Sequence, residues 1–215
     1  MESINAFFKY KVARKLVVIE FVLTYLYFLY NFFPFFYSFT PETFFRVNYL
    51  IQSLLMIYIW WTFRKALKEK FRIQNMDGFF IIIVLIIGVG QFSYFFQLNT
   101  YLPEVLSKFS SLAYSAIFIA FALKLFSIPE EFYGLKKPIV YSLIAIYILT
   151  IPYALIGQIF EYRMLFNSLQ IGGFVAGLMN TIYMVRFFKR AETDQGKPAI
   201  DPLEEMIEEI GEGDQ

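Results

Sequence analysis

Two ionisable side chains lie inside otherwise apolar stretches of this chain, and they are the first residues that could do chemistry. Glu20 lies about one helical turn into the first stretch, and Lys124 about one turn before the end of the fourth. Charged groups are costly in hydrocarbon and are usually paired or functional there. We therefore predict an ion pair between Glu20 and Lys124 that holds the two stretches together. The alternative is that both side chains reach up to the membrane surface.

Most other groups that support catalysis are missing from the chain. It has no cysteine and no histidine, so disulfides, thiol chemistry and imidazole metal sites are excluded. Its four aspartates all lie outside the apolar stretches, so none supplies the buried acidic pair or metal site that intramembrane hydrolases use. We predict that the protein is not an enzyme, holds no metal or cofactor and binds no nucleic acid.

Uncharged polar residues near the middle of the apolar stretches are a second group of candidates. Gln52, Gln91 and Asn180 should point into a helical bundle, because lipid offers their amides no hydrogen-bond partner. They either bond one helix to another or line a polar cavity.

Aromatic residues crowd the ends of several stretches, with Tyr30 and Phe95 among them. An aromatic belt at the membrane surface accounts for such residues. The alternative is a pocket for an apolar or cationic ligand, with Gln91 and Gln97 as its nearest polar groups.

The elements that must position these residues are six apolar stretches of about twenty residues, each long enough to cross the hydrocarbon as a helix. The chain is 58% hydrophobic and only 17% charged, whereas about a quarter of a soluble domain is charged. We predict an all-α polytopic membrane protein, a bundle of six transmembrane helices. The spans are expected near 16–37, 44–63, 79–98, 106–127, 139–159 and 165–187.

Basic residues predict how these spans face. Sixteen of the nineteen Lys and Arg residues lie on one side of the six stretches, and only Arg46, Lys108 and Arg163 lie on the other. Because basic loops stay in the cytoplasm, we expect a multi-pass cell-membrane protein with both termini cytoplasmic.

Three helical hairpins are the predicted organisation. A cytoplasmic lead-in over 1–15 precedes a membrane domain over 16–190, whose outer turns share a Glu followed by a basic residue. This spacing is typical either of a decayed repeat or simply of helix starts. Gly173 and Gly177 leave room for another helix to approach closely, so they are candidates for a homo- or hetero-oligomer contact.

The acidic tail over 191–215 differs from the rest of the chain. Asp201 suits a helix N-cap and Gly211 a helix end, which predicts a short amphipathic cytoplasmic helix over 202–210. We expect this segment, 201–210, to dock on a cytosolic protein or on the chain's own basic loop; the alternative is a solvated tail. Its apolar face is formed by Leu203, Met206, Ile207 and Ile210.

These observations favour a non-enzymatic membrane protein that acts as a sensory, signalling or scaffold module and contacts a cytosolic partner through its tail. One alternative is a small-solute or lipid transporter or channel, which the central polar residues favour. Another is an accessory subunit of a larger membrane complex, which the small-residue faces allow.

Overall fold

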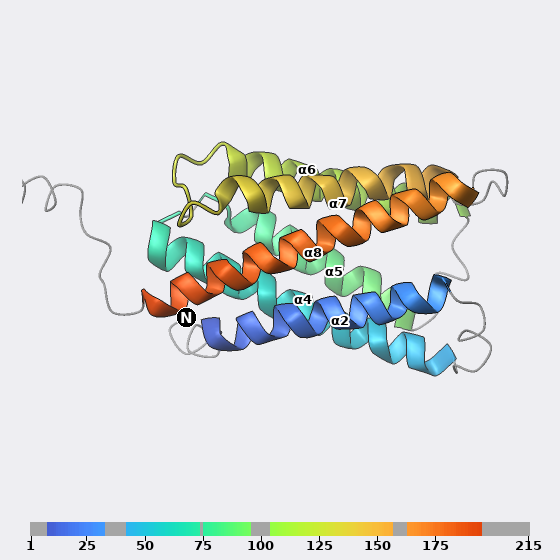
Figure 1. Cartoon of the computed structure of the whole chain (residues 1–215), viewed down its shortest axis with the longest axis horizontal. Coiled ribbons are helices and arrows are strands. Elements are labelled where there is room, and N and C mark those ends of the chain that lie inside the picture. Colours follow the sequence, from blue (N-terminus) through green and yellow to red (C-terminus); the bar gives the residue numbers. More distant parts are fainter. Residues whose placement is uncertain (1–7, 33–41, 74, 96–103, 157–162, 195–215) are drawn as a thin grey trace, which may run out of the picture.

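The computed structural model of the chain describes residues 8–32, 42–73, 75–95, 104–156 and 163–194. Within these ranges the chain forms six helices and no strand. Each apolar stretch of the sequence coincides with one helix, so the prediction of an all-α chain with six helices is confirmed. The helices are α2 (Tyr10–Phe32), α4 (Glu42–Phe71), α5 (Asp77–Phe95), α6 (Glu104–Phe126), α7 (Lys136–Ile156) and α8 (Arg163–Thr193), shown in Figure 1.

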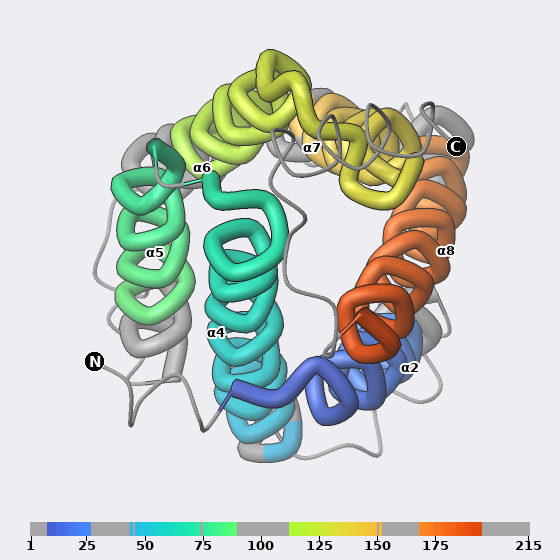
Figure 2. The backbone as a smooth tube through the Cα atoms, turned by 90° about the vertical axis from the view of Figure 1, so that its left-hand side faces the viewer, coloured from blue at the N-terminus to red at the C-terminus, as the bar shows by residue number. Residues whose placement is uncertain are grey.

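The six helices run lengthwise and form a ring when viewed along the bundle (Figures 1 and 2). The ring order is α2, α4, α5, α6, α7, α8, and it closes where α8 packs on α2. Helix α5 packs on α4 and has few contacts with α6. The middle predicted hairpin is therefore the loosest of the three, and the repeat of three equivalent hairpins stays a prediction.

Two helices are longer than the apolar stretches that predicted them. The second span was expected to end near 63 and the sixth near 187, but α4 continues to Phe71 and α8 to Thr193. Both extensions keep one apolar face in the core: Ala66 and Leu67 are buried on α4, and Phe188 and Ala191 on α8. The extensions are amphipathic, so a search for unbroken apolar runs stops before the helices do.

A layer of aromatic side chains joins opposite sides of the ring. Trp60 on α4 lies in the middle of this layer, with ring centroids 5.7 Å from Phe118 and 5.4 Å from Phe121 on α6. Phe80 on α5 lies 5.1 Å from Phe121, and Phe63 on α4 lies 4.9 Å from Phe187 on α8. These edge and tilted ring contacts fill the space that the weak pairing of α5 and α6 would otherwise leave open.

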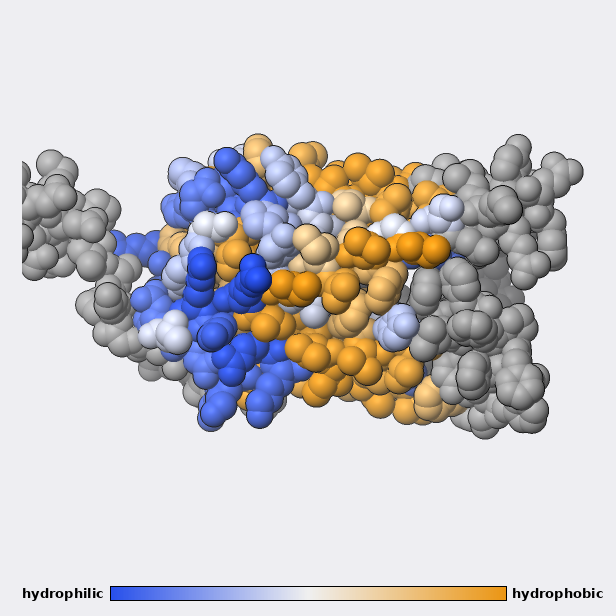
Figure 3. Space-filling model, viewed as in Figure 1, coloured by the Kyte–Doolittle hydropathy of each residue, from blue (hydrophilic) through white to orange (hydrophobic). Residues whose placement is uncertain are grey.

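The outward faces of the helices are apolar. Large hydrophobic side chains are exposed on every helix, and Figure 3 shows apolar residues gathered on the viewed face beside a hydrophilic end. Soluble monomers rarely expose large contiguous apolar patches. Examples from the six helices are Val22, Leu54, Leu85, Leu123, Ile148 and Val175.

One helix among the described residues, Ser168–Thr193, is long and apolar enough to cross a membrane by length and composition. Two shorter apolar segments are Asp77–Val89 and Leu112–Phe126. The structure therefore confirms the helical architecture and identifies one candidate membrane helix among the described residues. That all six helices cross the membrane stays a prediction.

The hydrophilic end of the bundle, here called the charged end, is held by ion pairs between elements. Arg64 and Lys68 on α4 contact the Asp77 carboxylate at the start of α5 at 2.8 and 2.5 Å. Burial alone would raise the pKa of Asp77, but the two cations outweigh it and hold that pKa below its ordinary value. On the other side of the ring, Arg14 on α2 contacts Glu192 on α8 at 2.9 Å. The charged end comprises residues 8–15, 64–77, 124–137 and 186–194.

The connection between α6 and α7 adds a second set of contacts at this end. Phe132 and Tyr133 both have left-handed backbones, with φ of 48° and 61°, a conformation that is unfavourable for bulky residues. Packing compensates: Phe132 is fully buried, and its ring lies 5.2 Å from Phe71 on α4. The Tyr133 carbonyl accepts a hydrogen bond from Arg190 on α8, which fixes the connection against that helix.

Asp194, at the base of the tail, is bonded to both of these elements. The Tyr133 hydroxyl donates to its carboxylate at 3.0 Å, and the Lys70 ammonium donates to its backbone carbonyl. Burial first, and the hydrogen bond to Asp194 second, raise the pKa of Tyr133 well above the usual tyrosine range, so this hydroxyl stays a donor. The point where the acidic tail leaves the bundle is therefore joined to α4 and to the α6–α7 connection.

Candidate functional site

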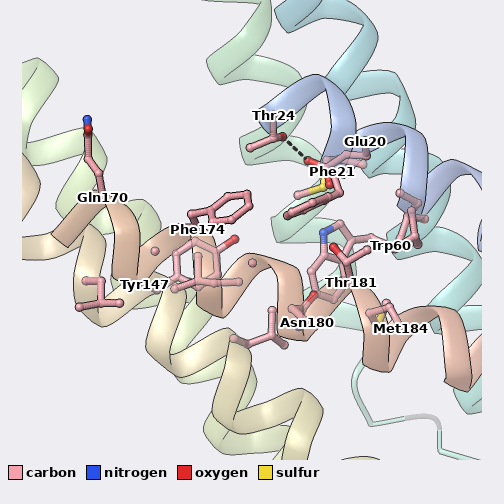
Figure 4. A pocket seen from close by; sticks show the side chains of 18 of the residues that line it. Glu20, Phe21, Thr24, Trp60, Tyr147, Gln170, Phe174, Asn180, Thr181 and Met184 are labelled. Carbon is pink, nitrogen blue, oxygen red and sulfur yellow. Dashed lines mark hydrogen bonds between the residues drawn. The ribbon is translucent and has the colours of Figure 1, made fainter. Parts of the chain in front are cut away.

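A cavity of about 460 Å³ lies inside the ring between α2, α4, α7 and α8. Its volume falls in the range of ligand sites, which is roughly 300–1,000 Å³. Most of the lining residues are apolar, and each of the four helices also contributes at least one polar side chain (Figure 4). The polar lining residues are Glu20, Thr24, Trp60, Tyr147, Gln170, Asn180 and Thr181.

Glu20 brings the only charge to this lining. It is half-buried on α2, and its Oε1 accepts a hydrogen bond of 2.9 Å from the Thr24 hydroxyl one turn later. A carboxylate offers about four acceptor positions, so Thr24 occupies only a part of them. None of the described residues around the cavity is a lysine or an arginine. The described wall of the cavity therefore contains one carboxyl group and no basic side chain.

Trp60 brings a donor that has no acceptor. The residue is only 4% exposed, and its indole Nε1 is buried with no hydrogen-bond partner in the described part of the chain. An unpaired buried donor costs about 1–3 kcal/mol. The Trp60 ring itself packs in the aromatic layer against Phe118 and Phe121. A bound molecule with an acceptor atom would remove that cost.

On the α7 and α8 walls, several polar side chains have hydrogen-bond partners within the protein. The Asn180 amide donates to the Ser142 hydroxyl at 3.0 Å, and that hydroxyl donates to the Ile139 carbonyl at 2.9 Å. Tyr147 stacks on Phe118 with centroids 4.4 Å apart, which fixes its ring at the cavity wall. The Asn180–Ser142 bond joins α8 to α7, and the Tyr147–Phe118 stack joins α7 to α6.

Small residues create the space on the α8 side. Gly173 and Gly177 both line the cavity, and a Cβ built at either position would meet nothing within 4 Å. The close helix contact is made instead by Gly172, whose added Cβ would lie 3.2 Å from Leu149 on α7. The structure thus places the predicted oligomer residues at an internal space, and the oligomer itself stays a prediction.

The structure does not bring Glu20 and Lys124 together. Lys124 lines a different cavity of about 440 Å³ at the charged end, with Arg72 and Glu130 nearby. The two helices that carry the predicted pair, α2 and α6, lie on opposite sides of the ring (Figure 2). The prediction compared the depths of the two residues along the chain's apolar stretches, which does not determine which helices are neighbours.

Other predicted site residues are divided between described and undescribed parts. Asn180 reaches the cavity, whereas Gln52 does not line it; the Gln52 Nε2 is buried without a partner among the described residues. Several predicted residues lie outside what is described, by side chain or altogether. They are Tyr30, Gln91, Phe95 and Gln97 of the predicted aromatic pocket, and Leu203, Met206, Ile207 and Ile210 of the predicted tail helix.

Four aromatic residues of the cavity were not predicted from the sequence: Phe21, Trp60, Tyr147 and Phe174. The signals available were weak. Trp60 is one of only two tryptophans and lies within one turn of the end of the predicted span 44–63, where tryptophan is usually found at a membrane surface, so nothing in the sequence marked it as a cavity residue. Phe174 follows directly after Gly172 and Gly173, which open space beside it.

Comparison of the chain with protein-family models, with curated proteins and with solved structures found no match. What the site does must therefore be argued from its own residues.

Proposed function

We propose that the protein is a six-span membrane sensor that binds a small ligand in the Glu20 cavity and passes its occupancy to the cytoplasmic tail. Exposed apolar side chains on all six described helices, and the gathering of charged residues at one end of the described part of the bundle, support the membrane arrangement. The basic residues at that end support a cytoplasmic location for it and for both termini.

One observation carries the proposal: helix α8 lines the cavity and also ends next to Asp194 at the base of the tail. It supplies Gly173, Phe174, Gly177 and Asn180 to the cavity, and the same unbroken helix ends at Thr193, next to the base of the tail. A helix transmits a shift or rotation along its length, because its hydrogen bonds keep successive turns in register. A ligand that moves α8 at the cavity would therefore displace Asp194.

The contacts at Asp194 give such a displacement a readout. Lys70 and Tyr133 hold this residue from two other elements, and Arg190 holds the Tyr133 carbonyl from α8 itself. A small movement of α8 would break or remake these bonds, which changes how the acidic tail is presented to a cytosolic partner. The tail segment 201–210 remains the proposed docking element.

A ligand screen tests the cavity as the sensor site. Neutral, anionic and cationic amphiphiles are each added to the full chain in lipid nanodiscs, and the thermal unfolding midpoint is measured. Gly177→Leu should abolish any stabilising response, because its side chain fills the open space on α8. Gly88→Leu is the matched control: Gly88 on α5 also has nothing within 4 Å of an added Cβ, but it does not line the cavity.

Hydrogen exchange tests the coupling. Any amphiphile that stabilises the wild type should also change amide exchange over 186–194, and Gly177→Leu alone should mimic or block that change. The sensor proposal is overturned if no amphiphile responds, or if every response is equal in Gly177→Leu and Gly88→Leu. It is also overturned if ligands bind while exchange over 186–194 stays the same.

Transport is the second candidate function, because the cavity lies in the interior of the ring and is lined by four different helices. Uptake of a screened ligand into proteoliposomes, lost in Gly177→Leu and kept in Gly88→Leu, would favour transport. Binding with no uptake would favour sensing.

A further inference from the structure

We infer that the ligand of the Glu20 cavity is an organic cation: an amine or quaternary ammonium group attached to an apolar body that carries a hydrogen-bond acceptor for the Trp60 N–H. This inference rests on the proposed ligand site and names the chemical class that the site selects.

Charge is the first argument. The cavity wall contains one carboxylate, Glu20, and none of its described lining residues is basic. Lys124 cannot compensate, because it lines the separate cavity at the charged end. Charge interactions inside a bundle act through a low dielectric, so a cation bound beside Glu20 would stabilise the ionised form of this carboxyl group and be attracted to it, whereas an anion would gain no such attraction.

The walls around the carboxylate are the second argument. Phe21 and Phe174 face each other from α2 and α8 with centroids 5.4 Å apart, and Tyr147 lines the cavity from α7. Aromatic faces attract cations, and groups of them recognise quaternary ammonium ions. They also provide apolar contact area for the rest of the molecule. Glu20, Phe174 and Tyr147 surround the same space in Figure 4.

Trp60 argues against a lipid acyl chain as the occupant. Its buried Nε1–H has no partner among the described residues, and a hydrocarbon chain would leave it without one. Glu20 would likewise gain nothing from a hydrocarbon chain. A wholly apolar occupant therefore fits the shape of the cavity but not its two polar groups.

Tetraphenylphosphonium and tetraphenylborate test the sign of the charge directly, because they share size and shape and carry opposite charges. The full-length protein is placed in zwitterionic phosphatidylcholine nanodiscs, and each ion is measured separately by equilibrium dialysis against empty nanodiscs. We expect saturable binding of tetraphenylphosphonium and none of tetraphenylborate above the background. Glu20→Gln, which keeps the shape and an acceptor for Thr24, should weaken the cation at least about tenfold.

Two further variants separate this effect from a general loss of structure. Glu131→Gln makes the same chemical change at the charged end, where the Glu131 side chain is 56% exposed, and should leave binding unchanged. Phe174→Leu keeps an apolar wall but removes an aromatic face, and should weaken the cation about two- to fivefold. Circular dichroism and the thermal midpoint of each variant establish that the helices are intact.

The inference is overturned if both ions bind equally, or if Glu20→Gln and Glu131→Gln have the same effect. It is also overturned if tetraphenylphosphonium fails to bind while neutral amphiphiles give the cavity-dependent response described above. In that last case the ligand site stands and only its chemical class is wrong. A failure of the whole screen would instead overturn the ligand site itself.

Discussion

The charged end and the Glu20 cavity are both rich in polar side chains, yet they treat them in opposite ways. At the charged end, Arg64, Lys68 and Asp77 satisfy one another, and Tyr133 and Lys70 both bond to Asp194. In the cavity, Trp60 has an unpaired donor and Glu20 receives one hydrogen bond from its own helix. Polar content alone does not mark a site; polar groups left for an absent partner do.

The comparison also separates stability from ligand recognition. A closed network such as that around Asp77 joins α4 to α5 and is complete without a ligand. The cavity wall keeps its shape through apolar packing and through the Asn180–Ser142 bond. The Glu20 carboxyl group, however, has no basic partner among the described residues of that wall. The first region should therefore respond to substitution by losing stability, and the second mainly by losing binding.

The largest stability effect should come from the aromatic layer that separates the two regions. Trp60→Ala removes a large buried side chain that contacts rings on α4, α5 and α6, and should lower the free energy of unfolding by about 3–5 kcal/mol. Leu54→Ala on the same helix is the control, because Leu54 is 61% exposed on the outward face. Chemical unfolding in detergent measures both, and equal losses would contradict the assignment of a core layer.

The next effect should come from Lys136 at the start of α7. Its ammonium is buried and donates to the Ile128 carbonyl at 2.7 Å, with Glu131 at 3.3 Å. Lys136→Met leaves that buried carbonyl unpaired and should cost about 1–3 kcal/mol by the same unfolding measurement. The neighbouring Lys137→Met removes an exposed ammonium and should cost much less. If the two variants unfold alike, the contacts of Lys136 with Ile128 and Glu131 do not stabilise the start of α7.

A smaller and pH-dependent effect should come from Asp77. Its pKa is lowered in the folded protein, so its stabilising contribution is present above the unfolded pKa of about 4 and is lost as the pH falls through the lower folded value. Asp77→Asn should therefore reduce stability at pH 7 by about 0.2–1 kcal/mol, allowing for the solvent exposure of this carboxylate. The difference from wild type should shrink as the pH falls below about 4 and vanish once the pH lies below the lowered folded pKa. A difference that is constant from pH 7 to pH 2 would show that charge is not the cause.

A stability effect of similar size but opposite sign should separate the two kinds of glycine on α8. Gly177→Ala adds a methyl group in open space and should stabilise the helix by about 0.5–1 kcal/mol through helix propensity alone. Gly172→Ala should gain less, because its methyl group meets the Leu149 side chain at 3.2 Å. Thermal unfolding in detergent orders the two variants, and the reverse order would argue that the space at Gly177 is filled.

Six helices could be predicted from the sequence because each is dominated by an apolar stretch of sufficient length. Their ends could not, since α4 and α8 continue as amphipathic helices through the basic segments, where Ala66 and Phe188 stay buried. The grouping of basic residues at one end was also readable. The order of the helices in the ring could not be predicted. The outward-facing and core-facing sides of each helix are both apolar, so the periodic alternation of apolar and polar residues that usually marks the buried face is lost.

The candidate site was only partly within reach for the same reason. Glu20 and Asn180 stood out as polar residues in apolar surroundings, and both reach the cavity. The Glu20 partner was predicted as Lys124, since depth was known but neighbours were not. Trp60 and Phe174 look like ordinary core residues in the sequence. Only the three-dimensional arrangement reveals that one carries an unpaired donor and that the other faces Phe21.

The contact between α2 and α8 closes the ring with the first and last of the described helices. The ribosome makes Glu20 long before it makes the helix that lies opposite it. Until α8 is inserted, the cavity has no fourth wall, and the Glu20 carboxylate must be sheltered by something other than its final neighbours. The four walls of the cavity are therefore assembled only after α8 has been made, and a shortened chain that lacks α8 would lose Gly173, Phe174 and Asn180 from the proposed site.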